Sequence, residues 1–371
     1  MSAAPAASAS SPPVGLESAI CHLDGERQQL SYRGYDVRTL SESSSYEEVA
    51  FLLVRGRLPE GRELRSFGAA VRRGMRLKPA TRRLLSAVAG RADAMTALRT
   101  VVAGLPATEE LGEGWDADEA AALVGKVAGI VAALHHHDVG TKVPETESGA
   151  GFATNVLRLL GHADPDIRVA RAFDAALILR ADNELNPSAY AARVAASCGT
   201  DLCGCVAAAL AALGGPQHGG HSAAVRRMLD EIGAAAAASG WVAARVAEGG
   251  AIPGFGHPVY REDPRTGTTR GLAEVVCRRN GMPDWFELAQ KVEERVVSAT
   301  GKPANVDYYL GVLYKALGIP LALYTPIFAV ARIAGWIAHA HEQRAVPGLI
   351  RPRATYVGPR DLRYPERRRP A

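Results

Sequence analysis

The sequence has few aromatic residues and no strong excess of charge of either sign. Aromatic residues make up 6% of the 371 positions, and Lys and Arg exceed Asp and Glu by only 43 to 39. A basic balance this weak, spread along a long chain, predicts no nucleic-acid partner and is compatible with an anionic small molecule. The apolar residues are mostly Ala, Val and Leu, which favours an α-rich globular protein.

Cysteines are scarce too, and their number, five, is odd. A disulfide framework is therefore not indicated, and we expect a reducing, cytoplasmic location. Cys203-Gly204-Cys205 lacks the two-residue spacer of common zinc motifs, so we expect both thiols to fill core space. The histidines at 135–137 cannot all face one ion from a helix, so we expect surface or helix-end positions and no metal there.

An uninterrupted apolar run long enough for a membrane span is also missing. The longest apolar region, 319–338, contains Pro320, Pro326 and Arg332, which favours a buried helix over a transmembrane one. Residues 1–14 are Ala-, Ser- and Pro-rich without a basic start or an apolar segment. We expect a disordered leader there and neither a targeting segment nor a membrane partner.

Local signals predict one hairpin followed by many helices. Asp24-Gly25 separates two short alternating runs, which is typical of a β-hairpin. Ser45 and Glu48 fit a capping box for a helix that ends near Gly56. Asn186-Pro187 predicts an N-cap followed by Pro at the first helical position, with helices over 187–199 and 202–213.

Three Gly- or Pro-rich turns carry side chains suited to acid–base chemistry. Two contain His218 and His257, and the third contains Asp307. Glycines beside a histidine let backbone approach a ligand closely. Two histidines and one carboxylate can act as acid, base and hydrogen-bond donor; they could also bind a metal, but their wide spacing does not favour that. The turns span 214–220, 252–261 and 303–309.

These turns resemble those of the citrate synthase family, whose members carry a G-P-x-H-G-G turn, a G-[FY]-G-H turn followed by D-P-R, and an N-V-D turn. The matching segments are 215–220, 254–257 with 263–265, and 305–307. Four further segments resemble family signatures in the same order, so the resemblance runs nearly end to end. They are Gly15-Leu16-Glu17, Tyr32-Arg33-Gly34-Tyr35, Thr325-Pro326-Ile327-Phe328 and Arg351-Pro352-Arg353-Ala354.

The resemblance implies an all-α, two-domain fold with a small N-terminal β-hairpin. A large helical domain would comprise residues 15–219 and 315–371. A smaller mobile domain, 220–314, would close over the substrates and exclude water. It also implies a homodimer with shared active sites.

The implied activity is a condensation of acetyl-CoA with oxaloacetate, followed by hydrolysis of the thioester to citrate and free CoA. By resemblance, Asp307 would remove a methyl proton and His218 would donate a hydrogen bond to the thioester oxygen. His257 would polarise the ketone and supply a proton to the new alkoxide. The family needs no metal or redox cofactor, since acetyl-CoA is a substrate.

The resemblance also assigns the groups that bind the substrates. Arg265, Arg332 and Arg351 stand at carboxylate-binding positions, and Arg351 would reach the neighbouring subunit's site. Arg332 interrupts an apolar helix, so we expect it to be buried and paired. The CoA-binding positions are Pro253, Gly254, Phe255, Gly256, Arg261 and Asn305.

The sequence departs from the family at two positions in one turn. Members read His-Ala-Asp-His-Glu where this chain has Arg180-Ala181-Asp182-Asn183-Glu184. Asn183 stands where a histidine normally donates to the oxo acid, and an uncharged amide is a weaker donor. Arg180 either offers a cation to the site or faces solvent. Three alternatives stay open: a 2-methylcitrate synthase, a citryl-CoA lyase-like enzyme, and a weakly active paralogue that binds CoA or a carboxylate.

Overall fold

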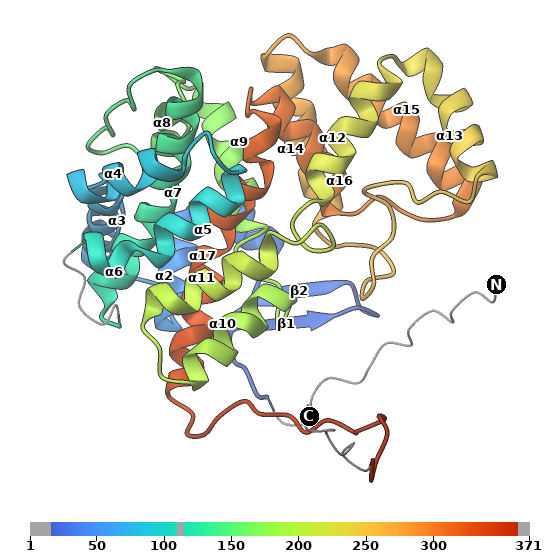
Figure 1. Cartoon of the computed structure of the whole chain (residues 1–371). Helices are drawn as coiled ribbons and strands as arrows, with labels where there is room; N and C mark the ends of the chain where they lie inside the picture. Colours follow the sequence, from blue (N-terminus) through green and yellow to red (C-terminus); the bar gives the residue numbers. More distant parts are fainter. Residues whose placement is uncertain (1–15, 110–114, 363–371) are drawn as a thin grey trace, which may run out of the picture.

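The computed structural model describes residues 16–109 and 115–362. These residues are mostly helical, with one small sheet near the N-terminal end (Figure 1). The predicted fold class, all-α with an N-terminal hairpin, is confirmed. The predicted leader, 1–14, lies outside the described residues.

The sheet has the predicted hairpin and one additional strand. β1 (Cys21–Asp24) pairs antiparallel with β2 (Gln29–Tyr32), with Cys21 opposite Tyr32. β3 (Tyr35–Asp36) pairs with the far edge of β2. A strand of two residues is too short to show an alternating pattern, which is why the sequence did not predict it.

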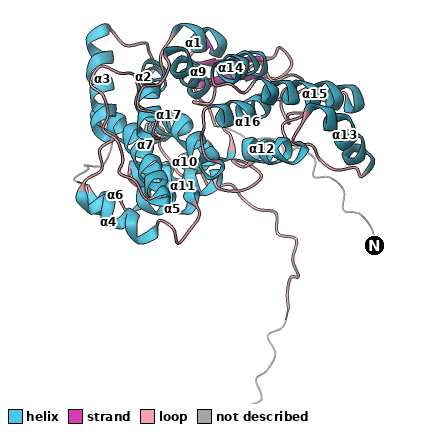
Figure 2. Cartoon of the chain, turned by 90° about the horizontal axis from the view of Figure 1, so that it is seen from above, coloured by secondary structure: helices cyan, strands magenta, loops and turns pink. Residues whose placement is uncertain are grey.

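Helices from the two ends of the chain gather into one group, on the left of Figure 1. Figure 2 shows the same grouping from above. Its helices are α1 (Val37–Ser43), α2 (Tyr46–Arg55), α3 (Gly61–Gly74), α4 (Pro79–Val88), α5 (Ala94–Ala103), α6 (Leu105–Thr108), α7 (Ala117–Val139), α8 (Phe152–Leu159), α9 (Ile167–Ile178), α10 (Pro187–Ser197), α11 (Leu202–Leu213), the 3₁₀ turn η2 (Leu321–Leu323) and α17 (Tyr324–Arg344).

A second group, on the right of Figure 1, comes from a single stretch of chain. Its members are α12 (His221–Ile232), the 3₁₀ turn η1 (Ala235–Ala237), α13 (Ala238–Ala247), α14 (Thr266–Arg279), α15 (Pro283–Thr300) and α16 (Val306–Ala316). The residue ranges proposed for the large domain (15–219 and 315–371) and the small domain (220–314) stay a prediction, as does independent motion of the smaller one.

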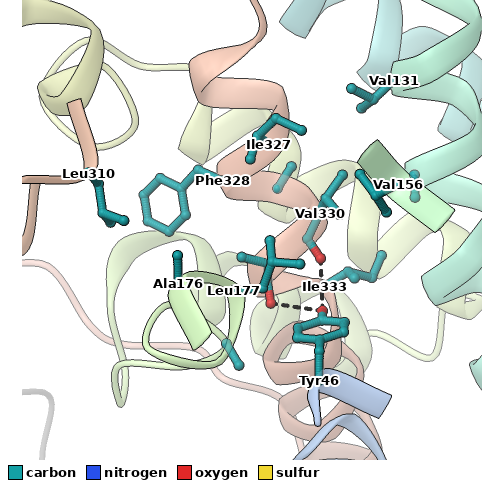
Figure 3. Close-up of a cluster of buried hydrophobic side chains, with 14 of the residues drawn as sticks. Tyr46, Val131, Val156, Ala176, Leu177, Leu310, Ile327, Phe328, Val330 and Ile333 are labelled. Carbon is teal, nitrogen blue, oxygen red and sulfur yellow. Dashed lines mark hydrogen bonds between the residues drawn. The ribbon is translucent and has the colours of Figure 1, made fainter. Parts of the chain in front are cut away.

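Helix α17 is the core of the first group. The segment Leu321–Arg344 is apolar and long enough to cross a membrane, but 83% of its most apolar window is buried inside the protein. Burial of this kind is typical of a core helix. The Tyr46 hydroxyl donates to the carbonyl oxygens of Val330 (2.8 Å) and Ala331 (2.9 Å), which fixes α2 against α17 (Figure 3).

The predicted helix caps are present, one of them in altered form. Asn186 accepts a hydrogen bond from the Ala189 N–H, and Pro187 is the first residue of α10. Ser45 accepts from the Glu48 N–H as predicted. The Glu48 carboxylate, however, accepts from the Ser44 hydroxyl, so the reciprocal half of the capping box is replaced by a bond to the preceding serine.

The cysteine prediction is confirmed, and the histidine prediction is confirmed only in part. Cys203 and Cys205 are buried in the core. The three histidines end α7, but His136 is buried and structural: its Nδ1 lies 2.6 Å from Thr141 Oγ1 and its Nε2 2.8 Å from the Leu159 carbonyl. Within 16–109 and 115–362, no group of three His, Cys, Asp or Glu side chains could hold a metal.

Helices α3 and α7 approach each other closely at glycines. A Cβ atom at Gly125 would overlap the Val71 carbonyl, and one at Gly74 would overlap the Ala122 carbonyl. In contrast, a Cβ at Gly68, also on α3, would meet no atom within 4 Å among the described residues. The close packing of these two helices therefore requires glycine at the contact positions.

We predict that Gly125→Ala destabilises the protein while Gly68→Ala does not. The added methyl at 125 must push α3 from α7, at a cost of about 1–3 kcal/mol. At 68 the better helix propensity of alanine stabilises the helix by about 1 kcal/mol. Thermal unfolding by circular dichroism should show a lower Tm for the first variant only. Equal Tm values for the two variants would contradict this account of the contact.

Candidate active site

A cavity of about 660 Å³ lies where the two helical groups meet. All three predicted catalytic side chains line it, and they come from both groups. The first group contributes Arg180, Asn183, His218, Phe328 and Arg332; the second contributes Phe255, His257, Arg265, Asn305 and Asp307. Among these ten residues, Arg180 and Arg332 are 152 positions apart in the chain.

The two turns of the second group are fastened to each other by backbone. The Asn305 N–H donates to the Gly254 carbonyl (2.8 Å), and the Gly256 N–H donates to the Pro303 carbonyl (2.8 Å). The Asn305 side chain adds a bond to the Gly256 carbonyl (2.7 Å) and accepts from the Asp307 N–H (3.0 Å). His257 and Asp307 are thereby held on one rigid piece of backbone.

Asp263 locks Arg265 against the same piece. The Arg265 guanidinium donates from Nε and Nη2 to the two Asp263 oxygens, each at 2.8 Å, and both side chains are buried. The Val306 N–H also donates to Asp263, at 3.1 Å. A bidentate pair of this kind fixes the plane of the guanidinium, and Arg265 lines the cavity in this fixed orientation.

Backbone contacts fix the tautomer of His257. The N–H groups of Val259 and Tyr260 both donate to Nδ1, at 3.1 and 3.2 Å. A neutral ring with an accepting Nδ1 carries its hydrogen on Nε2. Burial, followed by the nearby charge of Arg265, lowers the pKa of His257, so the ring is a neutral donor at pH 7.

His218 contacts the first helical group through Ser188. Its Nε2 lies 2.8 Å from the Ser188 hydroxyl, which also accepts from Trp336 Nε1 (3.0 Å). The hydroxyl proton can point to His218 Nε2 or to Asn186 Oδ1, 2.7 Å away. Pointed at His218, it leaves the ring hydrogen on Nδ1. Burial and the charges of Arg332 and Arg180 lower the pKa of His218 to about 4, so this ring is neutral as well.

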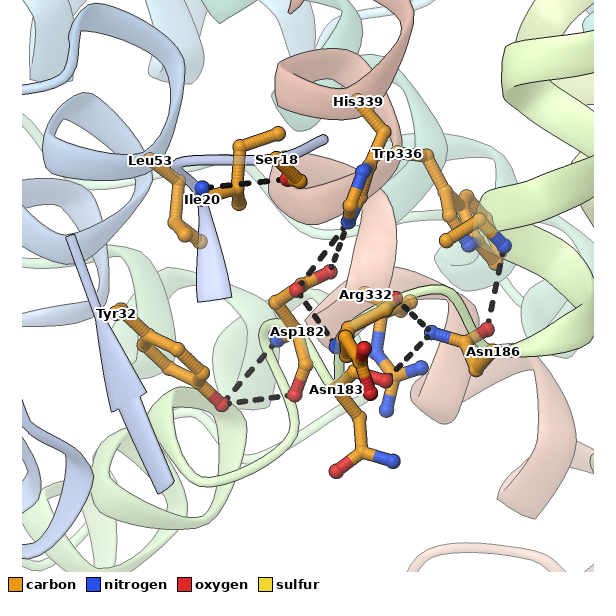
Figure 4. A network of polar contacts seen from close by, with 12 residues as sticks. Ser18, Ile20, Tyr32, Leu53, Asp182, Asn183, Asn186, Arg332, Trp336 and His339 are labelled. Atoms are coloured by element: carbon orange, nitrogen blue, oxygen red, sulfur yellow. Dashed lines mark hydrogen bonds and ion pairs between the residues drawn. The ribbon is translucent and has the colours of Figure 1, made fainter. Parts of the chain in front are cut away.

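The turn that departs from the family, 179–186, is held by its neighbours (Figure 4). The Tyr32 hydroxyl donates to the carbonyl of Asp182 (3.0 Å) and accepts from the Asp182 N–H (3.2 Å). His339 on α17 contacts the buried Asp182 carboxylate at 3.3 Å. Glu184 adopts a positive φ of 54°, which a side chain tolerates only where the surroundings enforce it.

Arg332 is buried, as predicted, but only half paired. Its Nε donates to the Arg180 carbonyl at 2.7 Å. Its Nη1 is buried and finds no hydrogen-bond partner in the part of the chain that the structure describes. Burial lowers the pKa of Arg332 to about 10, against the opposing effect of Asp182. A cation in this position still carries its charge at pH 7 and is free to bind an anion.

The sequence left open whether Arg180 offers a cation to the site or faces solvent. In the structure Arg180 is buried and offers a cation to the site. Only 3% of the residue is exposed. One guanidinium nitrogen donates to Asp307 Oδ1 at 2.7 Å and the other donates to the Ser222 hydroxyl at 3.0 Å. The guanidinium also lies 3.5 Å from the ring centroid of Phe328, a cation–π distance.

The same oxygen of Asp307 accepts from Arg180 and from Ser222. Burial opposes ionisation of this carboxyl, but the Arg180 charge and the Ser222 hydrogen bond outweigh burial and lower the pKa of Asp307. The carboxylate is therefore ionised at pH 7. Oδ2 remains to accept a proton from a bound molecule.

Two predicted site residues lie away from the cavity. Arg351 is exposed on the extended segment after α17, and Arg261 is exposed beside the second turn. Neither lines the cavity formed by this chain. Asn183 does line it, and its Oδ1 is buried without a partner among the described residues.

Ser188 and Ser222 were not predicted. Each contacts a catalytic side chain that is 30 or 85 positions away. A serine directly after an N-cap, or near a helix start, is common for local reasons. The sequence therefore held no signal for the longer-range contact.

Comparison with known proteins shows the same family throughout. The family model for the citrate synthase C-terminal domain matches residues 13–353. The citrate synthase of Synechocystis is 37% identical over 356 residues, which covers 94% of this chain and 90% of that protein. The 2-methylcitrate synthase of Mycobacterium tuberculosis is 36% identical over 350 residues, which covers 92% and 88%.

A solved structure gives the same result in three dimensions. The ternary complex of carboxymethyl coenzyme A and oxaloacetate with the citrate synthase of Thermoplasma acidophilum superposes with a TM-score of 0.87. That protein is 30% identical to this chain, and the match covers 95% of this chain and 96% of the Thermoplasma chain. With matching sequence, fold and order of turns, the chain belongs to the citrate synthase family.

Proposed function

We propose that this chain condenses acetyl-CoA with oxaloacetate and hydrolyses the resulting thioester to citrate and free CoA. One observation carries the proposal: His257 and Asp307 sit on two turns fastened together, and they share one cavity with His218 and with cations. A base, two neutral donors and anion-binding groups are the set that this reaction requires.

The reaction begins at the acyl methyl group. Asp307 Oδ2 removes a proton from it, and the electron pair of the C–H bond forms the enol carbon–carbon double bond. The thioester oxygen gains negative charge as this happens. His218 stabilises that oxygen by donating from Nδ1, which carries the ring hydrogen when the Ser188 hydroxyl donates to Nε2.

The second step forms the new carbon–carbon bond. The enol carbon attacks the ketone carbon of oxaloacetate, and the ketone oxygen becomes an alkoxide. His257, with its hydrogen on Nε2, polarises this oxygen and then protonates it. Transfer of the proton held by Asp307 to His257 restores both groups. Water then adds to the thioester carbon and the carbon–sulfur bond breaks. One water proton goes to the sulfur, so CoA leaves as the thiol, and the other is released as the new acid ionises to a carboxylate.

Three arginines provide for the two carboxylates of oxaloacetate. Arg332 presents a buried nitrogen that has no partner within 16–109 and 115–362, and Arg265 presents a guanidinium fixed by Asp263. Planar guanidinium groups match carboxylates in geometry. Arg351 is the third, and it belongs to the site of the neighbouring subunit in a homodimer. CoA lies along the second turn, at Pro253, Gly254, Phe255 and Gly256, with Asn305 and Arg261 beside it.

We infer the location of the enzyme from its cysteines and its metabolic role from the proposed reaction. The cysteines at 21, 198, 203, 205 and 277 are free thiols, which suits a reducing compartment. We place the enzyme in the cytoplasm. Citrate formed there from acetyl-CoA and oxaloacetate enters the tricarboxylic acid cycle.

A propionyl group in place of the acetyl group is the second candidate substrate, which would give 2-methylcitrate. It is favoured by one finding: the relative named 2-methylcitrate synthase is 36% identical to this chain, against 37% for a relative named citrate synthase. Overall similarity therefore does not separate the two acyl groups.

We predict that the purified protein releases CoA from acetyl-CoA when oxaloacetate is present, and that Asp307→Asn abolishes this activity. An amide cannot accept the methyl proton, so turnover should fall by about 10²–10⁴-fold, with a smaller effect on KM. The assay follows free thiol with acetyl-CoA and propionyl-CoA against several oxo acids. Asp230→Asn, which removes the partner of Arg226 on α12, is the control and should leave turnover unchanged.

Two outcomes would contradict the proposed reaction, and a third would contradict the role of Asp307. No CoA release across the panel by folded protein would favour a CoA- or carboxylate-binding paralogue. Release of acetyl-CoA and oxaloacetate from citryl-CoA without condensation would favour a lyase. Retention of most of the wild-type rate in Asp307→Asn would remove Asp307 as the base.

We predict that two inactive variants restore activity when their subunits mix. A heterodimer of Arg351→Ala and Asp307→Asn subunits has one site with both residues intact. Half of the dimers in an equal mixture are heterodimers, so about a quarter of the wild-type activity should return. Each variant mixed with itself is the control. Differently tagged chains show whether the subunits have exchanged. If activity does not recover although exchange has occurred, the sites are not shared.

We predict that Asn183→His lowers the KM for oxaloacetate. Asn183 lines the cavity with an unpartnered amide oxygen, and an imidazole supplies a stronger donor to the substrate. Turnover should change less, because the bond already forms in the ground state. The measurement is KM for oxaloacetate and for the best alternative oxo acid. Unchanged values for both would show that position 183 does not face the substrate.

A further inference from the structure

Arg180 stands in this chain where the family has a histidine, and its contacts cross from one helical group to the other. It lies just beyond α9 in the first group, while Asp307 and Ser222 belong to the second. The guanidinium makes an ion pair of 2.7 Å with Asp307 and a hydrogen bond of 3.0 Å with Ser222. Only 4% of the Arg180 side chain is exposed, against 15% for Asp307.

We propose that Arg180 is a positioning residue for the catalytic base: it holds Asp307 by its Oδ1 atom and so directs Oδ2 at the acyl methyl group. The inference rests on the proposed function, in which Asp307 is that base. Three contacts fix the guanidinium itself: Asp307, Ser222 and the ring of Phe328. A cation held in this way leaves the carboxylate little freedom to rotate.

The role differs from substrate binding because the two terminal nitrogens of Arg180 are already engaged by the protein. Both Nη atoms donate to protein groups. In Arg332 the buried nitrogen without a partner among the described residues is the terminal Nη1, whereas in Arg180 it is Nε. We therefore assign Arg180 to the proposed base and the other arginines to the oxo acid.

The pairing has a consequence for the pH dependence of turnover. An adjacent arginine lowers the pKa of an aspartate by about 1–3 pH units, and the base works only when it is ionised. Turnover is therefore retained to lower pH than it would be without Arg180. Loss of Arg180 raises the pKa of Asp307 and moves the acid limb of the profile to higher pH.

Other groups around Asp307 contribute charge without replacing the contact of Arg180. His221 opens α12, Arg265 precedes α14, and both favour the ionised carboxyl. Among the charged groups of the described residues, Arg180 is the one in direct contact with Asp307. The titratable or charged groups that face Asp307 from the elements around it are Arg180, His218, His221, His257, Arg265 and Tyr314.

The test compares pH profiles of turnover for the full-length wild type, Arg180→Gln and Arg180→Lys. Arg180→Gln should lower kcat at pH 8 at least tenfold and shift the acid limb upward by about one pH unit or more. KM for oxaloacetate should change less than threefold, since Arg180 does not bind it. Arg180→Lys keeps the charge but cannot bond to both Asp307 and Ser222. The acid limb of its pH profile should therefore stay near that of the wild type, while kcat falls.

Arg171→Gln is the matched control. Arg171 is on α9 and pairs with an aspartate, Asp174, at 2.8 Å, but it does not line the cavity. Its pH profile should equal that of the wild type. An unmoved acid limb in Arg180→Gln would overturn the proposal. So would a rise of more than tenfold in KM for oxaloacetate with kcat unchanged, because Arg180 would then be a substrate ligand.

A stability measurement separates failure of this inference from failure of the proposed function. Wild-type protein that releases no CoA contradicts the proposed function, and a double-variant cycle then decides about the pair. At pH 7 the Tm of the double variant Arg180→Gln/Asp307→Asn should fall by less than the sum of the decreases in the two single variants. Each single change leaves one buried member of the pair without its charged partner, and the double change does not. Strictly additive losses would overturn the proposal.

Discussion

The ion pair between Arg180 and Asp307 is the interaction on which the site depends. It is largely buried and joins the two helical groups across the cavity. Buried charges are costly unless they are paired, so the separation of these two side chains is strongly disfavoured. In our proposal the pair sets the position of Asp307, the proposed base, relative to His218 and Arg332, which belong to the other group.

Around this pair, each helical group holds its own part of the chemistry rigidly. In the second group, backbone bonds between the 254–256 and 303–305 segments carry both His257 and Asp307. In the first, Tyr32 and His339 hold the turn that presents Arg180 and Asn183 (Figure 4). Closure of the smaller group over the cavity stays a prediction, and it would move each half as a unit. That is the arrangement expected of a site that excludes water when it closes.

The sequence predicted the parts of the site that depend on local pattern. The three turns, the Asn186-Pro187 helix start and the hairpin at Asp24-Gly25 are each defined within about ten residues, and all are present. Resemblance to a family then supplied the roles of His218, His257 and Asp307. Tyr35–Asp36 was missed because a strand of two residues leaves no periodic signal.

What the sequence could not predict depends on contacts between distant segments. Arg180 reaches Asp307 across 127 positions and Ser188 reaches His218 across 30. Nothing local distinguishes a buried arginine that pairs with a base from one that faces solvent, so both positions stayed open. Only the fold, which brings the residue after α9 to Ser222 on α12 and Asp307 on α16, decides between them.

The most direct test is a crystal structure of the protein with oxaloacetate and a non-reactive acetyl-CoA analogue. The account predicts that Arg180 still contacts Asp307 Oδ1, that Oδ2 faces the methyl position of the analogue, and that Arg265 and Arg332 bind the carboxylates of oxaloacetate. An Arg180 guanidinium that has left Asp307 and binds a substrate carboxylate would contradict it.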